Sequence, residues 1–294
     1  MKNKYKFLTL LFFTFIVLNS CDREEVITQE IEQAELVYDF SVEVKNNMLS
    51  FPTREDYDKS LEYLGSKNSK QFKEWEDSLN FTSMRLSLSE NERESIGVVD
   101  DLLATLINSK GEIEIGGNIF KLDVLNETVE VTPAISKNSK LLNKSIKKYS
   151  IYDNILDIID GTDEPLSLAE RRRYCSKRKV TTTGNLLIDA KITYQKAGFL
   201  NSLQSKIKRR RIADFINIGL KTVGNNFWQN KKHRGAIGFR QTSLVSGSEK
   251  SYRPYYSSRR LRSFSFSVEF SHQDERYEGT NDRITYTNLS LNCN

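Results

Sequence analysis

The feature that most constrains the fold is a strict two-residue alternation near the C-terminus. Every second residue from 264 to 270 is large and apolar, and polar residues stand between them: Phe264, Phe266, Val268 and Phe270 alternate with Ser263, Ser265, Ser267 and Glu269. Successive side chains of a strand point to opposite faces, so this segment has one apolar and one polar face. Such a strand is typical of an antiparallel sheet that is packed on one side.

Weaker alternation extends this pattern over the C-terminal region. Apolar residues recur in the same way at 186–194 and at 284–291. The sequence therefore predicts an antiparallel, β-rich and sandwich-like domain over residues 171–294. Residues 212–223 are the exception, and we expect a short helix that lies on the sheet there.

The preceding region has helical spacing. Thr53 and Asp56 resemble a capping box at the start of a first predicted helix. A second helix is expected to have Ser69 as its cap and to bury Trp75, and a third to span residues 100–107. The aromatic residues of these helices are predicted to be core, because their spacing already explains them.

A glycine pair indicates a hairpin in the same region. Residues 116–117 are both glycine and separate two alternating segments, 112–115 and 118–122. Residues 37–131 are therefore predicted to be a small α+β domain. The Ser-, Asn- and Lys-rich residues 132–170 are predicted to be a linker that contains one short helix. The whole chain is assigned to the α+β class.

The first residues have the pattern of an export signal. Three lysines within residues 1–6 precede twelve uncharged residues, 7–18, and the segment ends on Leu18-Asn19-Ser20-Cys21. Twelve helical residues rise about 18 Å, which is too short for a bilayer core of about 30 Å. The ending resembles a bacterial lipobox, which implies removal of residues 1–20 and acylation of Cys21. Residues 21–36 are then a polar tether to the bilayer.

Charge is divided between the two predicted domains. Residues 22–170 hold 16 Lys and Arg against 31 Asp and Glu, whereas residues 171–294 hold 25 against 8. Such asymmetry suggests contact with a polyanion or attraction between the two parts of the chain. Both interpretations stay open at the level of sequence.

Two cysteines remain if Cys21 is acylated. Cys175 precedes the first strand of the basic region, and Cys293 is the penultimate residue. Because an exported protein meets oxidising surroundings, we predict a disulfide between them. Two unlinked buried thiols are the alternative.

A search for catalytic motifs finds none of the familiar ones. The sequence lacks a glycine-rich phosphate loop, a Gly-x-Ser-x-Gly elbow, a His-Glu-x-x-His helix and a Cys-x-x-Cys pair. Its two histidines, His233 and His272, lie far apart, and His233 is flanked by cations. No catalytic residue, metal ligand or cofactor is predicted. Carboxylates brought together by folding could still form a glycosidase pair.

Basic clusters are the better indication of function. The segment 252–260 interleaves tyrosine with arginine, and arginine pairs bidentately with carboxylate and phosphate groups. The candidate anion-binding residues are Lys208, Arg209, Arg210, Arg211, Tyr252, Arg253, Tyr255, Tyr256, Arg259 and Arg260. A merely solvated basic face is the alternative.

Three segments resemble a recurring arrangement in uncharacterised lipoproteins of the Bacteroides and Flavobacterium group. They are FPTREDY at 51–57, FKEWEDSL at 72–79 and GEIEIGG at 111–117. The acidic residues 22–25 resemble the export signal of surface-displayed lipoproteins in the same group. The resemblance implies an outer-membrane lipoprotein, with display at the cell surface as a further expectation. It brings no catalytic residue.

The leading hypothesis is therefore a non-enzymatic, membrane-anchored binding or adhesion lipoprotein. Its basic domain is expected to bind an anionic polysaccharide, a lipid phosphate or an acidic protein. Cytosolic nucleic acid is not an expected partner, because the chain is predicted to be exported. The alternatives are a cell-surface hydrolase of glycans and a structural envelope protein whose acidic and basic parts dock on each other.

Overall fold

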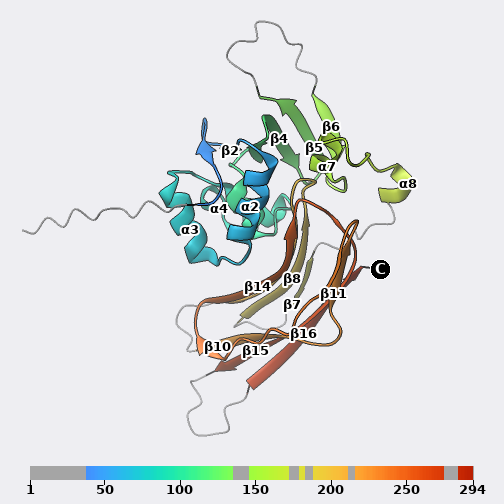
Figure 1. The fold of residues 1–294 in the computed structure, drawn as a ribbon. Coiled ribbons are helices and arrows are strands. Elements are labelled where there is room, and N and C mark those ends of the chain that lie inside the picture. The colour runs from blue at the N-terminus through green and yellow to red at the C-terminus, as the bar shows by residue number, and fades with distance from the viewer. Residues whose placement is uncertain are drawn as a thin grey trace, which may run out of the picture. The chain divides into compact units, whose positions relative to one another are not determined.

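The computed structural model describes residues 38–134, 146–171, 179–182, 188–210, 216–274 and 284–293. Asp39–Asn294 form one compact unit. We call residues 39–171 the N-terminal part and residues 179–293 the β-rich part. The first holds the helices and one sheet, and the second holds two sheets (Figure 1). This arrangement confirms the α+β class. The predicted signal, Cys21 and the tether lie outside the described residues.

Seven short helices lie in the described residues of the N-terminal part. They are α2 (Arg54–Gly65), α3 (Ser69–Ser78), α4 (Met84–Ser87), α5 (Glu90–Ser95), α6 (Asp101–Leu106), α7 (Ile155–Ile159) and α8 (Leu168–Arg171). The predicted cap of α2 is confirmed, because the Thr53 side chain accepts a hydrogen bond from the Asp56 N–H. The start of α3 was misplaced by one residue: Asn68, not Ser69, is its cap and forms a capping box with Gln71.

The N-terminal part also contains a six-stranded sheet. In spatial order its strands are β1 (Glu43–Val44), β2 (Leu49–Phe51), β3 (Glu112–Ile115), β4 (Asn118–Asp123), β5 (Thr128–Pro133) and β6 (Lys147–Ser150). The predicted hairpin is β3–β4. Gly116 and Gly117 form its two-residue turn with φ of +57° and +73°, which glycine adopts without steric cost.

Strand β6 corrects part of the predicted linker. Lys147–Ser150 pairs antiparallel with β5 as the edge of the sheet. Its sequence, Lys-Lys-Tyr-Ser, is mostly exposed and has no alternation of apolar residues. An edge strand with lysines of this kind gives little signal in the sequence, because its side chains are not buried.

Two sheets pack face to face in the β-rich part. The first is β14 (Glu249–Ser257), β9 (Asn201–Arg209), β8 (Ile188–Lys196) and β7 (Lys179–Thr182), in that order. The second comprises β12 (Arg234–Ala236), β11 (Phe227–Asn230), β15 (Leu261–Asp274), β10 (Ile216–Thr222), β13 (Val245–Ser246) and β16 (Ile284–Cys293). All of their pairings are antiparallel.

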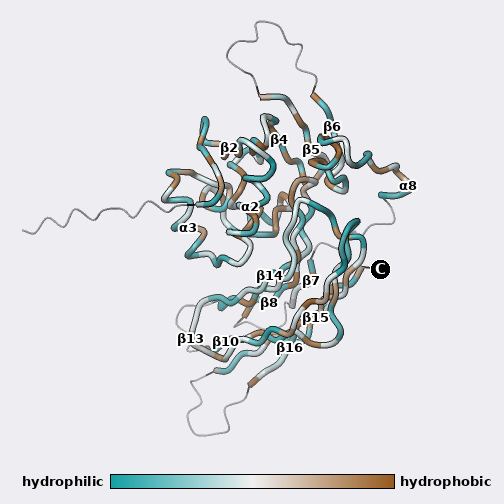
Figure 2. The backbone as a smooth tube through the Cα atoms, viewed as in Figure 1, coloured by the Kyte–Doolittle hydropathy of each residue, from teal (hydrophilic) through white to brown (hydrophobic). Residues whose placement is uncertain are grey.

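One apolar core lies between these sheets. The inward residues of β8, such as Ile192 and Tyr194, share it with Phe264, Phe266 and Phe270 of β15. The Tyr194 and Phe264 rings lie 5.0 Å apart in an edge-to-face arrangement. The predicted sandwich is thus confirmed, and Figure 2 shows apolar (brown) and polar (teal) stretches along its strands.

The helix expected over residues 212–223 is wrong where the structure describes it. Ile216–Thr222 is strand β10, which pairs with β15 along its whole length. Ile218 and Leu220 enter the core, and Lys221 lies on the opposite face. Strand pairing with a long neighbour overrides the weak local preference of these residues.

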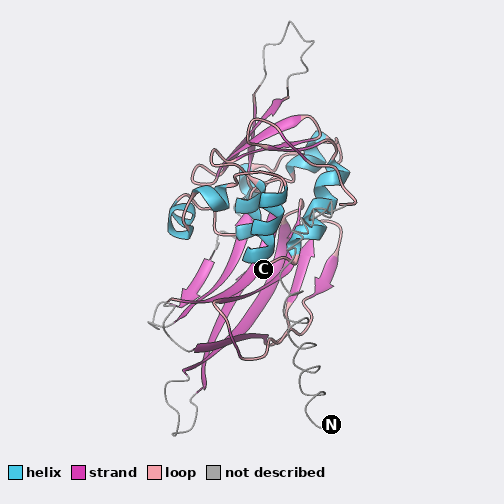
Figure 3. Cartoon of the chain, turned by 90° about the vertical axis from the view of Figure 1, so that its left-hand side faces the viewer, coloured by secondary structure: helices cyan, strands magenta, loops and turns pink. Residues whose placement is uncertain are grey.

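Strands β8 and β9 are buried on both faces. Their outward residues are polar, yet Lys191, Gln195, Ser202, Gln204 and Lys206 are all buried. Figure 3 shows most helices gathered between the long strands and the smaller sheet. Helices α5 and α6 contact this sheet face through Lys191 and Lys206.

Candidate functional site

The outer face of β8 and β9 carries a cluster of ion pairs. Lys206 Nζ lies 2.7 Å from Asp101 Oδ2 of α6 and 3.1 Å from Glu249 Oε2 of β14. Lys191 Nζ pairs with Glu90 and, at 2.7 Å, with Glu94 Oε1, both of α5. We call Glu90, Glu94, Asp101, Lys191 and Lys206 the sheet-face cluster. It joins acidic helices of the N-terminal part to lysines of the β-rich part.

The members of the sheet-face cluster keep each other charged. Burial alone would raise the pKa of Glu90, but Lys206 and Lys191 lower it to about 2. Burial likewise opposes ionisation of Asp101, and Lys206 with Arg93 holds its pKa well below the ordinary value. Burial would lower the pKa of Lys206, whereas Asp101, Glu249 and Glu90 raise it. The cluster therefore stays ionised at neutral pH.

Lys208 and Arg253, two candidate anion-binding residues, contact this same face. Lys208 Nζ donates to Glu90 Oε2 at 3.0 Å, although its side chain is still partly exposed. The Arg253 side chain is only 3% exposed and donates to Asp100 Oδ1 at 2.9 Å and to Gly65 O at 2.8 Å. Asp100 also caps α6 and accepts from the Ser202 hydroxyl. Arg253 is thus an internal contact of the fold.

Arg259 joins a second group of charges. Its guanidinium donates two hydrogen bonds to the Asp157 carboxylate of α7, from Nε to Oδ2 at 3.0 Å and from Nη2 to Oδ1 at 3.1 Å. Arg54 of α2 donates to the same carboxylate at 2.7 Å. Burial would raise the pKa of Asp157, but the bonds from Arg54 and Arg259 lower it. A bidentate arginine was predicted here, and its carboxylate partner comes from the chain itself.

The three tyrosines of segment 252–260 all lie on strand β14. The Tyr255 hydroxyl donates to Arg259 O at 2.6 Å, and its ring lies 5.0 Å from that of Trp228. The half-buried Tyr252 packs against Phe266. Tyr256 lies against Gly65, where a Cβ would come within 2.3 Å of the ring. The absence of a side chain at Gly65 therefore lets α2 approach β14.

The remaining candidates are scattered. Arg209 is half-buried at the end of β9, and Arg210 is exposed. Arg211 lies outside the described residues. Arg260 is buried, and its N–H donates to Asn154 Oδ1 at 2.9 Å. The nine described candidates are therefore not one surface, and binding of an anion by the candidates stays a prediction.

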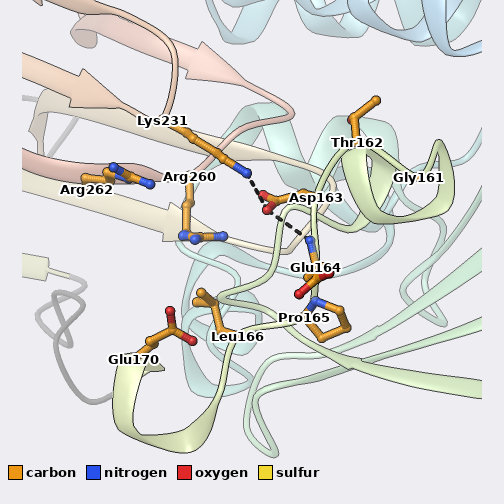
Figure 4. A pocket seen from close by; sticks show the side chains of 10 residues that line it. All are labelled: Gly161, Thr162, Asp163, Glu164, Pro165, Leu166, Glu170, Lys231, Arg260 and Arg262. Carbon is orange, nitrogen blue, oxygen red and sulfur yellow. Dashed lines mark hydrogen bonds and ion pairs between the residues drawn. The ribbon is translucent and has the colours of Figure 1, made fainter.

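A cleft of about 450 Å³ lies beside Arg260. Its lining consists of the segment after α7, one residue of α8 and the ends of two strand regions: Gly161, Thr162, Asp163, Glu164, Pro165, Leu166, Glu170, Lys231, Arg260 and Arg262. Figure 4 shows Arg260 pointing toward Leu166 and Lys231 reaching Asp163. Three cations from the β-rich part here face three carboxylates from the N-terminal part.

The wall of the cleft after α7 is held by hydrogen bonds. Helix α7 ends at Ile159, and Gly161 follows it with φ of +71°. The N–H groups of Thr162 and Asp163 both donate to Asp157 O. The Leu166 N–H donates to the buried Asp153 carboxylate at 2.9 Å. These bonds satisfy backbone N–H groups of a segment that forms neither helix nor strand.

Asp163 is an ionised member of this cleft. Lys231 Nζ donates to its Oδ1 at 2.6 Å, and Asn154 Nδ2 to its Oδ2 at 2.9 Å. Burial would raise the pKa of Asp163, but these two bonds lower it below its ordinary value. Asp163 is therefore unsuited to hold the proton that a general acid must donate.

A group of exposed cations lies on and after the β11–β12 hairpin. Lys232, Arg234 and Arg240 are exposed, and we call these three residues the hairpin patch. The Arg234 guanidinium lies 4.9 Å from the Phe227 ring centre, and Phe239, next to Arg240, is 71% exposed. The run Lys231–Arg234 is visible in the sequence as a charge run. Its aromatic neighbours come from other segments, which sequence reasoning missed.

The cysteines and histidines do not combine into a site among the described residues. Cys293 is buried. Cys175 lies outside the described residues, so the structure does not test a disulfide between the two cysteines. The disulfide stays a prediction. His272 is buried on β15, and His233 is exposed in the β11–β12 turn. Among the described ranges no three His, Cys, Asp or Glu side chains gather as a metal site would require.

Within the described part of the chain, no helix combines the length and apolar character needed to cross a bilayer. A predicted lipid anchor at Cys21 does not depend on such a helix.

Known proteins offer few matches to this chain. No protein-family model matches the chain, and no curated protein matches it. Among solved structures, a DUF4848 family protein from Bacteroides thetaiotaomicron is similar at 10% sequence identity, over 85% of this chain and 100% of that chain, with a TM-score of 0.22. At that TM-score the likeness carries no argument about fold or function.

Proposed function

We propose that the protein is an exported lipoprotein, attached to the outer membrane through acylated Cys21, that binds an anionic polysaccharide without catalysing a reaction. The anchor is supported by the basic start, the short apolar run and the lipobox-like ending of residues 1–21. Mass spectrometry of the native protein is expected to find residues 1–20 removed and fatty acids on Cys21. An uncut chain would contradict the anchor.

The hairpin patch is the observation that carries the binding role. Lys208, Arg253 and Arg259 already pair with carboxylates of the N-terminal part, so these pairs compete with any external anion. Lys232, Arg234 and Arg240 are exposed, and the Arg234 guanidinium stands over the Phe227 ring. Exposed cations with neighbouring aromatics suit a sulfated or carboxylated polymer, which needs several weak contacts rather than one deep pocket.

Column retention tests this proposal. The mature protein should be retained on immobilised heparin at low salt and eluted at moderate salt, because contacts between exposed charges are screened. The triple variant Lys232→Ala, Arg234→Ala, Arg240→Ala should elute much earlier. A control that replaces the exposed Lys110, Lys121 and Lys147 with alanine removes the same number of charges from the N-terminal part. Equal elution of both variants would contradict a role for the hairpin patch.

A structural envelope role is the second candidate, and the sheet-face cluster supports it. Its lysines and carboxylates neutralise each other across the two parts of the chain. The two roles use different residues and are compatible. If the wild-type protein passes through the heparin column at low salt, the structural role remains as the preferred one.

The hydrolase alternative has weaker support. Asp163, Glu164 and Glu170 line one cleft, as catalytic carboxylates would. A glycosidase, however, needs one carboxyl group whose pKa is raised, and the pKa of Asp163 is lowered. We therefore rank binding above hydrolysis.

A further inference from the structure

The outer face of the second sheet of the β-rich part is lined with small polar side chains. Its strands β15 and β16 lie on the side of the sandwich away from α2 and α3 (Figure 1). Residues opposite each other in an antiparallel pair share a face, so the register identifies the outward residues. We call this surface the open face. Most of its residues carry a hydroxyl or an amide and are exposed or half-exposed: Gln229, Ser263, Ser265, Ser267, Ser271, Gln273, Asn288, Ser290 and Asn292.

These polar groups bond to one another across the strands. The Ser265 hydroxyl donates to Asn292 Oδ1 at 3.0 Å, and the Ser267 and Ser290 hydroxyls share a bond of 2.8 Å. A hydroxyl has one donor and two acceptor positions, so one such bond does not exhaust it. The open face therefore presents ordered rows of donors and acceptors to which a polyhydroxylated ligand can bond.

An aromatic ring stands at each end of the open face. At one end Phe227 is in register with Ser265, and the Arg234 guanidinium lies 4.9 Å from the centre of its ring. At the other end Tyr286 is in register with Ser271 and is 56% exposed. The face of an aromatic ring is electron-rich, so it attracts the C–H face of a sugar ring. Hydroxyl and amide groups between two aromatic rings suit a polysaccharide.

Charges are few on the open face. Arg234, Lys221 and Glu269 are the only charged residues at outward positions of its described strands. Arg234 is in register with residue 263 of β15 through Gln229, and Lys221 with residue 269. The two cations therefore lie about 20 Å apart, at about 3.3 Å per residue. A polymer charged on every unit would bring anions against Glu269, and like charges at contact are unfavourable.

We propose that the open face binds a sparsely charged polysaccharide, in which carboxylates are separated by neutral, hydroxylated sugars. This ligand class refines the binding role proposed above and rests on it. Arg234 also belongs to the hairpin patch, so the polymer runs from that patch onto the sheet. One carboxylate of the polymer pairs with Arg234, its hydroxyls bond to serine and asparagine side chains, and one of its rings stacks on Tyr286.

The fold closes the open face at the Tyr286 end. Gly219 of β10 is in register with Tyr286 across β15, and a Cβ at Gly219 would come 3.2 Å from Thr242 O and 3.6 Å from Leu244 Cδ2. Thr242 and Leu244 therefore lie over the sheet here and form a step. The strip from Arg234 to this step is about 26 Å long at about 3.3 Å per residue, which accommodates several sugar rings. Paired strands shape the strip before a ligand arrives, so binding loses little free energy to ordering.

Three polymers test the ligand class by isothermal titration calorimetry on the mature protein. Hyaluronan alternates a uronic acid with a neutral sugar, polyphosphate is charged on every unit and has no sugar, and dextran has sugars without charge. We expect hyaluronan to bind at least about tenfold more tightly than either at moderate salt, because salt screens ionic contacts and not stacking. Equal or tighter binding of polyphosphate or dextran, or no binding of hyaluronan, would overturn the proposal.

The variant Tyr286→Ala tests the open face itself. It should weaken hyaluronan binding about tenfold, because the stacking surface is lost, and leave polyphosphate binding at low salt unchanged. Tyr149→Ala is the matched control, since Tyr149 is a half-exposed tyrosine on the edge strand β6 of the N-terminal part. It should leave hyaluronan binding unchanged. If the two variants bind hyaluronan equally well, the open face is not the site.

A second variant keeps the test independent of how well Tyr286→Ala folds. Ser290 is exposed in the middle of the open face, so Ser290→Glu should keep the fold, and circular dichroism checks this for each variant. The added carboxylate should weaken hyaluronan binding at least about tenfold, because it meets the uronic acids of the polymer. Unchanged affinity in this variant would contradict the proposed path of the polymer.

The heparin and hyaluronan experiments fail separately. If the hairpin-patch variant keeps full heparin retention, the proposed function fails. If that variant loses retention while Tyr286→Ala binds hyaluronan as the wild type does, the binding role holds and the ligand class is wrong. Loss of hyaluronan binding in both variants would support one continuous path from the hairpin patch across the open face.

Discussion

The two outer faces of the sandwich begin from similar chemistry and end in opposite surroundings. On β9 the outward residues Ser202, Gln204 and Lys206 are buried. On β15 the outward residues, such as Ser265 and Ser267, remain partly exposed. Both faces are polar, so polarity alone does not determine whether a sheet face meets water. The difference lies in what stands opposite each face.

The covered face shows what a polar interface inside one compact unit requires. Buried cations of this face meet carboxylates: Lys206 meets Asp101, and Arg253 meets Asp100. Unpaired burial of such groups would be prohibitive, and paired burial is tolerated. On the open face, Ser267 and Ser290 bond to each other at 2.8 Å and need no cover. The first face therefore tolerates little change, and the second tolerates much.

Replacement of Lys206 should have the largest effect. Lys206→Met keeps most of the apolar stem but leaves Asp101, Glu90 and Glu249 without their shared cation. We expect the free energy of unfolding to fall by about 3–5 kcal/mol, because the loss of one partner leaves buried charges uncompensated. Urea denaturation monitored by tryptophan fluorescence measures it.

The matched control is the same substitution on the open face. Lys221 of β10 lies opposite Glu269 and is half-buried. Lys221→Met should change the free energy of unfolding by less than about 1 kcal/mol, as for surface ion pairs. If both variants lose the same stability, the two faces are energetically equivalent and the comparison fails.

Acid should lower the free energy of unfolding, because it protonates carboxylates of the covered face. The pKa of Glu90 is about 2 in the folded protein against 4.5 as its ordinary value. A lowered pKa contributes stability that is fully present above about pH 4.5 and is lost as the pH falls toward 2. Because Glu90 is partly exposed, we discount its contribution for solvent screening to about 1–2 kcal/mol.

The comparison of wild type with Glu90→Gln isolates this contribution. The variant should show a smaller loss of unfolding free energy between pH 5 and pH 2 than the wild type, in urea titrations at several pH values. Asp101 titrates in the same direction, so the variant keeps part of the acid dependence. Identical slopes in both proteins would mean that Glu90 does not report on the cluster.

The sequence predicted the open face better than the covered one. The alternation at 263–270 describes a strand with one buried face, and local spacing is enough to reveal it. Strand β9 carries serine, glutamine and lysine outward, so its sequence resembles a charge run. Its cover depends on pairs such as Lys206–Asp101, which are 105 residues apart. Patterns within a short window do not contain that information.

The candidate site was predictable only in its chemistry. Arginine and lysine were identified as groups that seek carboxylates, and Arg253 and Arg259 do bind carboxylates. Which carboxylates they bind is decided by the fold, since Asp100 lies 153 residues from Arg253. The cleft was not foreseen, because its two walls come from segments that look like an ordinary turn and an ordinary strand start.

The smallest expected effect tests the open face directly. Ser267→Ala removes the hydroxyl pair with Ser290, and both groups can then bond to water. We expect the free energy of unfolding to change by less than about 0.5 kcal/mol. A loss above about 1.5 kcal/mol in urea denaturation would mean that this face is not solvated in solution. It would then have a covering partner, and the contrast with β9 would be between two covered faces.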